Sequence, residues 1–271
     1  MKTINVMKAS LLAGGMLMMS ALNAQELFVF SEPASNMPAR SISGKITGKF
    51  VKNRRIEQRY NPEIMLGLNK KWMVHGAVSF SDMYTEKLRF ESGKIYAKYR
   101  FYSDDQVHRH FRMAAFGEVA RSRNIMTYDE LSLDGDQSGV QGGMIVTQLW
   151  NKLAVSATTG YLYVTNARPK INRNAFVYQG YHYSLSAGHL VLPVEYKSFN
   201  QTNVNIYAEL LGQRATDKNR YFIDFAPAVQ LIFHSNAKLN IGYRFQLAGN
   251  MYRMANSGFL VSFERTFLNA F

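Results

Sequence analysis

The chain contains no cysteine among its 271 residues. This absence excludes disulfide frameworks, cysteine-ligated metal sites, thiol nucleophiles and acylation of a lipoprotein cysteine. Charged residues are scarce, at 19%, and only six prolines are present. Such a composition excludes a disordered, collagen-like or coiled-coil chain. No apolar run reaches the roughly 18 residues of a membrane-spanning helix, which excludes a helical membrane protein.

Aromatic and basic residues are plentiful by contrast. Phe, Trp and Tyr make up 13% of the chain, and 32 Lys and Arg against 19 Asp and Glu give a formal net charge of +13. The length fits one large domain or two small ones. An aromatic-rich, basic chain without apolar helices leaves one class of membrane protein open, which is the β-barrel.

Residues 1–24 have the organisation of a secretory signal peptide. Lys2 and Lys8 flank the start of an apolar stretch, and Ala24 ends it. A buried N-terminal helix is the alternative, but the stretch has no polar face. We therefore expect export, so nucleic acid is not an expected partner. Residues 25–40 follow, kept extended by two prolines, and they can hang in the periplasm, contact a partner or plug a barrel.

The rest of the chain, residues 41–271, alternates apolar and polar side chains. Near its start, Ile46 and Phe50 fall on one face of an extended chain, and Lys45 and Lys49 fall on the other. The same period recurs along the chain and predicts about 12 strands (10–14). The fold class that we predict is all-β, an antiparallel transmembrane β-barrel with its apolar face toward lipid.

The connections between these strands alternate in length. Residues 69–70, 150–152 and 235–236 form tight turns. Residues 53–60 form a longer connection, and residues 121–138 and 165–179 form long polar loops. Outer-membrane barrels have short periplasmic turns and longer outer loops. This order predicts that both ends of the barrel domain are periplasmic, and it is not expected of a soluble periplasmic β-protein, which is the alternative fold.

The last strand resembles the C-terminal targeting strand of Gram-negative outer-membrane barrels. That resemblance implies recognition by the barrel-assembly machinery. Arg265 and Asn269 interrupt the apolar face, and we expect a bulge or a register change near Arg265 to relieve this. The apolar and aromatic residues that carry the resemblance are Phe259, Val261, Phe263, Phe267 and Phe271.

Most of the chain also resembles a set of uncharacterised outer-membrane proteins of Bacteroidota. The resemblance implies a barrel with an assumed transport role and implies no catalytic residues. The segments that carry it are residues 31–38, 147–152, 239–245 and 264–269.

Charged side chains on the polar face are the candidate lining of the lumen. The predicted set contains eight basic and four acidic residues. The surplus indicates a cationic pore that favours anions, because rings of charge set pore selectivity. The alternative is an internal network of ion pairs that fills the lumen. The predicted lumen residues are Lys45, Lys49, Lys94, Lys98, Arg100, Arg112, Glu118, Glu209, Asp224, Lys238, Arg244 and Glu264.

Two other patterns bear on chemistry, and both are weak. His108 and His110 lie near two aspartates in a predicted turn, where imidazole and carboxylate could bind a transition metal, but a solvated polar turn explains them better. His182 and Ser184 share a strand face, as a base and a nucleophile would in a lipid-hydrolysing barrel. No motif accompanies that pair, so we predict no enzyme activity, no cofactor and no metal.

We therefore predict an outer-membrane barrel that passes a small, possibly anionic solute through a narrow basic lumen. A closed structural or interaction barrel is the main alternative, with outer-membrane lipid, lipopolysaccharide or a protein as its partner. A barrel enzyme acting on lipid is the third. The oligomeric state stays open. The basic residues of the outer loops that would meet lipopolysaccharide phosphates are Arg121, Arg123, Arg168, Lys170 and Arg173.

Overall fold

The computed structural model describes residues 28–53, 55–165, 176–195 and 200–271. The predicted signal peptide, the first residues of the segment after it, and three basic residues of the loop at 165–178 (Arg168, Lys170 and Arg173) lie outside the described residues. Within the described ranges, no helix is long and apolar enough to cross a membrane.

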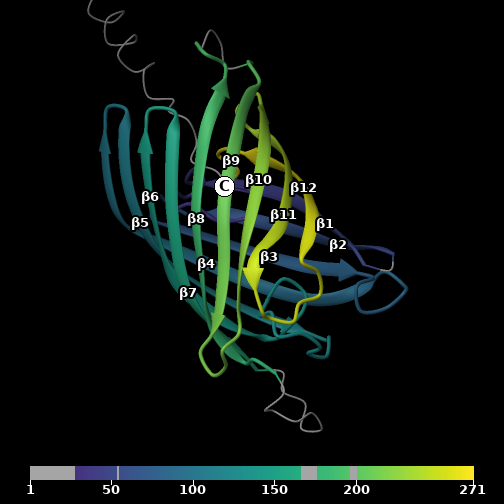
Figure 1. Cartoon of the computed structure of the whole chain (residues 1–271). Helices are drawn as coiled ribbons and strands as arrows, with labels where there is room; N and C mark the ends of the chain where they lie inside the picture. The colour runs from purple at the N-terminus through teal and green to yellow at the C-terminus, as the bar shows by residue number, and fades with distance from the viewer. Residues whose placement is uncertain (1–27, 54, 166–175, 196–199) are drawn as a thin grey trace, which may run out of the picture.

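Twelve antiparallel strands form one closed barrel, which confirms the predicted fold class. Each strand pairs with its neighbours in the chain, and the ring closes where β12 pairs with β1 (Figure 1). The strands are β1 (Ser41–Lys52), β2 (Ile56–Gly67), β3 (Trp72–Ser81), β4 (Arg89–Gln106), β5 (Arg109–Ser122), β6 (Gly139–Trp150), β7 (Leu153–Val164), β8 (Gln179–Leu192), β9 (Asn203–Ala215), β10 (Tyr221–Phe233), β11 (Ala237–Gly249) and β12 (Ser257–Phe267).

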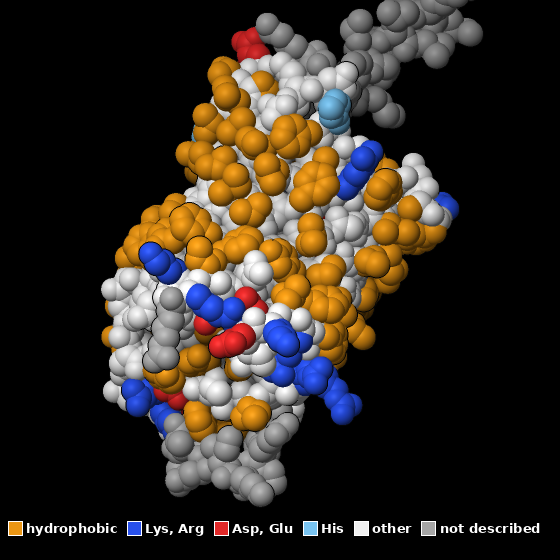
Figure 2. Space-filling view, turned by 90° about the vertical axis from the view of Figure 1, so that its right-hand side faces the viewer, with side chains coloured by type: hydrophobic (Ala, Val, Ile, Leu, Met, Phe, Trp, Pro, Cys, Tyr) orange, Lys and Arg blue, Asp and Glu red, His pale blue; other side chains and the backbone are white. Residues whose placement is uncertain are grey.

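Alternation along the strands separates an apolar outer face from a polar inner face. In β1 the side chains of Ser43 and Thr47 are buried, whereas Ile46 between them is exposed. Hydrophobic side chains cover the wall on the side of the molecule in Figure 2, and charged side chains gather toward its lower part. An apolar exterior around a polar interior is the arrangement of an outer-membrane barrel.

The two ends of the barrel differ in their connections. At one end, called the turn end, tight turns join β2 to β3, β4 to β5, β6 to β7 and β10 to β11. His108, Asn151 and His234 have positive φ in these turns, the backbone conformation that tight hairpins use. The β8–β9 connection, residues 193–202, is also at this end and is longer than the other four. At the opposite, loop end most connections are longer, including residues 123–138, as the sequence predicts. The predicted longer connection at residues 53–60 is wrong, because β1 and β2 are joined by residues 53–55 alone.

The expected bulge near Arg265 is wrong. The register of β12 against both β1 and β11 is continuous through this residue. Arg265 stays on the outer face with its guanidinium carbon 5.5 Å from the centre of the Phe267 ring. It lies close to the turn end, where a long side chain can carry its charge to the aqueous boundary. The strand ends at Phe267, and the carbonyl of Phe271, beyond it, accepts a hydrogen bond from Arg40 (2.7 Å).

Candidate functional site

Residues 28–40, here called the inner segment, enter the barrel from the turn end. The backbone N–H groups of Val29 and Phe30 donate to one carboxylate oxygen of Glu209 on β9, at 3.0 and 2.9 Å. The N–H of Ala34 donates to the Thr147 hydroxyl on β6 at 2.8 Å. Because these residues lack strand partners, side chains of the barrel wall supply their hydrogen bonds.

Lys98 on β4 holds the same segment from the other side of the lumen. Its ammonium group donates to the carbonyls of Pro33 (2.8 Å) and Ser35 (2.9 Å) and pairs with Glu32 (3.2 Å). The residue is only 1% exposed. A buried ammonium group is stable only when its charge is paired and its protons are bonded, as they are here.

Apolar packing also fixes the inner segment. Phe28 meets Tyr207 edge-on, with ring centroids 5.7 Å apart, and both are buried. The ring of Phe30 lies so close to Gly242 of β11 that a Cβ there would be 2.5 Å from it. A side chain at that strand position would displace the Phe30 ring, because the ring occupies its space.

The connection at 123–138, here called the inner loop, folds into the barrel from the loop end. Leu131 exchanges two hydrogen bonds of 2.8 Å with the side-chain amide of Gln213 on β9. Leu131 and Leu133 also pack in a buried cluster that includes Phe222 of β10. These contacts anchor the middle of the loop against the inner wall.

Acidic side chains of the inner loop pair with basic side chains of the wall. Arg59 on β2 forms a two-point pair with Asp136, at 3.0 and 2.7 Å. Lys49 donates to Asp134 at 2.6 Å, and Lys94 contacts the same carboxylate. The two ammonium groups hold the pKa of Asp134 well below its usual range. Asp134 therefore stays ionised at neutral pH and bridges two strands.

Glu130 makes a second ionic anchor of the inner loop. Its carboxylate lies 3.0 Å from Arg244 on β11 and 3.0 Å from Arg253 in the β11–β12 connection. Burial raises the pKa of Glu130, but the two guanidinium groups outweigh burial and leave it below its usual value. The loop is thus attached to the wall by several separate charged contacts.

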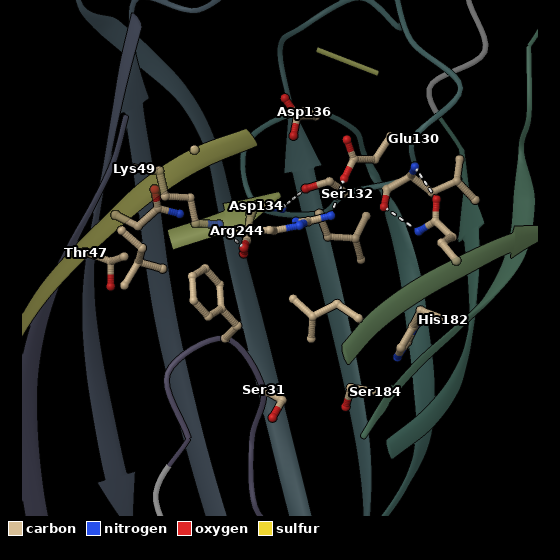
Figure 3. A pocket seen from close by; sticks show the side chains of 18 of the residues that line it. Ser31, Thr47, Lys49, Glu130, Ser132, Asp134, Asp136, His182, Ser184 and Arg244 are labelled. Carbon is tan, nitrogen blue, oxygen red and sulfur yellow. Dashed lines mark hydrogen bonds and ion pairs between the residues drawn. The ribbon is translucent and has the colours of Figure 1, made fainter. Parts of the chain in front are cut away.

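A cavity of about 490 Å³ lies between the inner segment and the inner loop. Figure 3 shows Lys49, Asp134 and Arg244 together on one side of it, with His182 and Ser184 on a strand across from them. Its described lining contains six basic and six acidic side chains. They are Lys45, Lys49, Arg59, Lys94, Arg244 and Arg253 against Glu32, Glu63, Glu118, Glu130, Asp134 and Asp136.

The predicted lumen residues have different surroundings in the structure. Five line the cavity, namely Lys45, Lys49, Lys94, Glu118 and Arg244. Lys98 and Glu209 hold the inner segment, and Arg112 donates to its Ser35 hydroxyl at 2.8 Å.

The four remaining predicted lumen residues lie in other contacts. Asp224, fully buried, pairs with Arg244 and Arg253. Lys238 pairs with Glu264 at 2.9 Å across β11 and β12. Arg100 donates to a backbone carbonyl of the β2–β3 turn at 2.6 Å.

Several cavity residues escaped the sequence analysis. Arg59 and Glu63 belong to β2, which begins at Ile56, whereas the sequence analysis placed residues 53–60 in a connection. Ile56 and Tyr60 on one face alternate with polar residues such as Arg59 on the other, and this is the signal that could have extended the strand. Pro62 reduces that signal, because proline ordinarily argues against a strand interior. The acids of the inner loop carried no signal, because a loop has no period that shows which way it folds.

Neither of the two weak patterns, His108 with His110 and His182 with Ser184, is joined by further catalytic or metal-binding groups among the described residues. His110 bonds Asp105 at 2.8 Å, and Arg112 occupies the same carboxylate oxygen. His108 sits in the turn, and the described residues hold no group of three side chains arranged for a metal. His182 and Ser184 do share the inner face of β8, but the neighbour of the His182 ring is Phe116, with centroids 5.9 Å apart.

Comparison with known proteins identifies the fold. No family model matches the chain, and no curated protein matches it by sequence. An outer-membrane channel from Pseudomonas putida F1 is similar in structure, with a TM-score of 0.62, 12% identity, and coverage of 89% of this chain and 100% of that one. The KdgM porin (0.54, 11%, 83% and 99%) and the NanC porin (0.52, 11%, 83% and 98%) are also similar. The resemblance to a Bacteroidota family stays a prediction, and the chain has the fold of porin-like outer-membrane β-barrels.

Proposed function

We propose that the protein is an outer-membrane channel that passes a small polar solute through the barrel without changing it chemically. The observation that carries this proposal is the polar cavity of about 490 Å³ between the inner segment and the inner loop. Its volume lies within the range of about 300–1,000 Å³ typical of small-molecule sites. The similar structures named above are a channel and two porins, which supports passage rather than catalysis.

The charge of the lining bears on which solute passes. The predicted preference for anions depends on a surplus of basic residues on the strands. In the cavity, the inner segment and inner loop add Glu32, Glu130, Asp134 and Asp136, so basic and acidic side chains are equal in number. We therefore expect weak ion selectivity, because balanced charges set no strong potential in a pore.

A closed barrel is the second candidate function. Specific observations favour it, because both the inner segment and the inner loop are bonded to the wall. Such a barrel would act through its outer surface, where Arg121 and Arg123 are exposed at the loop end and suit the phosphates of lipopolysaccharide.

Single-channel recording separates the two candidates. The chain from residue 25 onward is refolded, shown to be folded by its shifted mobility on an unheated gel, and added to a planar bilayer with a salt gradient. Discrete conductance steps with a small reversal potential are expected of the channel. A folded protein that gives no steps over a wide voltage range would refute the proposed passage and support the closed barrel.

A further inference from the structure

A row of rings lines one wall of the cavity. His75 on β3 lies against Tyr96 on β4, with centroids 4.2 Å apart, and Tyr96 stacks on Phe116 of β5 at 5.6 Å and 17°. Phe116 in turn approaches His182 of β8 at 5.9 Å. All four side chains line the cavity. The row therefore forms an aromatic face on the wall beside the contact of Lys94 with the inner loop.

A pair of glycines lets this row cross two strands that contribute no ring. Phe116 is in register with Gly143 of β6, which pairs with Gly160 of β7, which pairs with His182. A Cβ on Gly143 would lie 2.9 Å from the Phe116 ring, and one on Gly160 would lie 2.4 Å from the His182 ring. The rings of Phe116 and His182 therefore pack against the backbone of these glycines, and the aromatic face continues from β3 to β8.

Uncharged polar atoms without a hydrogen-bond partner lie in the same lining. They are the hydroxyls of Tyr96 and Thr158 and the side-chain oxygen of Asn61, all buried. The Nε2 atom of His75 is also without a partner, while its Nδ1 atom contacts Glu63. A buried polar atom left unpaired destabilises the protein, so a partner for it is favourable. A hydroxyl group suits atoms of either kind, because it both donates and accepts.

The charged side chains of the cavity are already matched. Each of the six basic residues in the lining has an acidic partner within 4 Å. An anionic solute would have to displace one of these carboxylates, whereas a neutral solute would leave them in place. The free interaction sites of the cavity are therefore an aromatic face and uncharged polar atoms.

We propose that this aromatic face binds a small neutral saccharide, which rests on the proposed channel function and names its class of solute. A sugar ring presents C–H groups on its faces and hydroxyls around its edge. Its face would lie on Phe116 and His182, and its hydroxyls would reach Thr158 and Tyr96. Aromatic contacts of this kind contribute beyond the area that they bury.

The test measures binding and passage separately. Maltose, as the neutral probe, and glucuronate, as the anionic one, are titrated into the folded barrel by calorimetry in a detergent without a sugar headgroup. The same sugars are added during bilayer recording. Phe116→Leu and Thr158→Val remove the ring and the hydroxyl with little change in size. Phe90→Leu changes an exposed ring on the outer face of β4 and is the matched control.

Saturable maltose binding, weakened about fivefold or more by Phe116→Leu and by Thr158→Val but not by Phe90→Leu, is the expected result. No maltose binding, or binding of glucuronate alone, would overturn the proposal. Maltose binding that all three variants retain would also overturn it, because another surface would then hold the sugar. If maltose binds but no conductance is seen, the saccharide site stands and the proposed passage fails. If the channel conducts but maltose neither binds nor interrupts the current, the passage stands and the saccharide site fails.

Discussion

Replacing Asp134 with asparagine should loosen the inner loop while leaving the barrel folded. The carboxylate of Asp134 joins Lys49 of β1 to Lys94 of β4 through two charged contacts. Asparagine keeps the size of the side chain and removes its charge. The strands themselves keep their hydrogen bonds, so the expected effect is local.

The size of the effect follows from the burial of the contacts. A hydrogen bond to a charged group contributes about 1.5–3 kcal/mol. The Asp134 side chain is 35% exposed, Lys49 is 33% exposed and Lys94 is 17% exposed, so solvent screens part of the interaction. We expect a loss of about 1–2 kcal/mol for the two contacts together, which raises the open population of the loop roughly 5–30-fold.

Limited proteolysis measures that population, because cleavage of a transiently opened segment follows its equilibrium fraction. Chymotrypsin is added to the folded barrel, and cleavage after Leu133, which is buried while the loop is closed, is followed by mass spectrometry. Asp217→Asn, in the exposed β9–β10 connection, is the control. A cleavage rate for Asp134→Asn within twofold of the unchanged protein would show that the ionic contacts do not hold the loop.

Three further predictions follow from other contacts. Lys98→Met removes the donors to the inner segment, so a Ser31→Cys reporter in this cysteine-free chain should react with maleimide at least tenfold faster; an equal rate contradicts this. Gly143→Ala places a Cβ 2.1 Å from a β7 backbone oxygen and should abolish the mobility shift of the folded barrel, whereas Gly44→Ala, with open space, should keep it. Because the folded pKa of Asp134 is lowered below its unfolded value, its contribution is complete above about pH 4 and is lost progressively as the pH falls further. The ratio of the pepsin cleavage rates of Asp134→Asn and the unchanged protein should therefore fall toward one between about pH 4 and pH 2, and a constant ratio contradicts this.

The barrel could be predicted from sequence because lipid imposes a period of two on every strand. Ile46 and Ile95 face outward and their neighbours face inward, and this contrast is visible without a structure. The start of β2 was missed because residues 53–60 are mostly polar and were assigned to a connection. Pro62, in the middle of the strand, also ordinarily argues against a strand interior. Arg59 was therefore absent from the predicted lumen.

The candidate site could be predicted only in part. Lys49 and Lys94 were assigned to the polar face because strands carry a period. Asp134 could not be paired with them, since nothing in a loop sequence shows that it folds back into a barrel. The role of the Gly143–Gly160 pair could not be predicted from the sequence either. It depends on the register between β6 and β7 and on the rings that pack against the two glycines.

The seam between β1 and β12 has a consequence for folding kinetics. Every other neighbouring pair of the described strands is consecutive in the chain, whereas Ile42 and Phe267, paired at the seam, are 267 − 42 = 225 positions apart. Closing a loop of that length costs roughly 3–4 kcal/mol more conformational entropy than closing a tight hairpin. Hairpins can therefore form early and in any order, while the seam waits for the whole ring. The largest entropic cost of assembly is therefore concentrated in a single pairing.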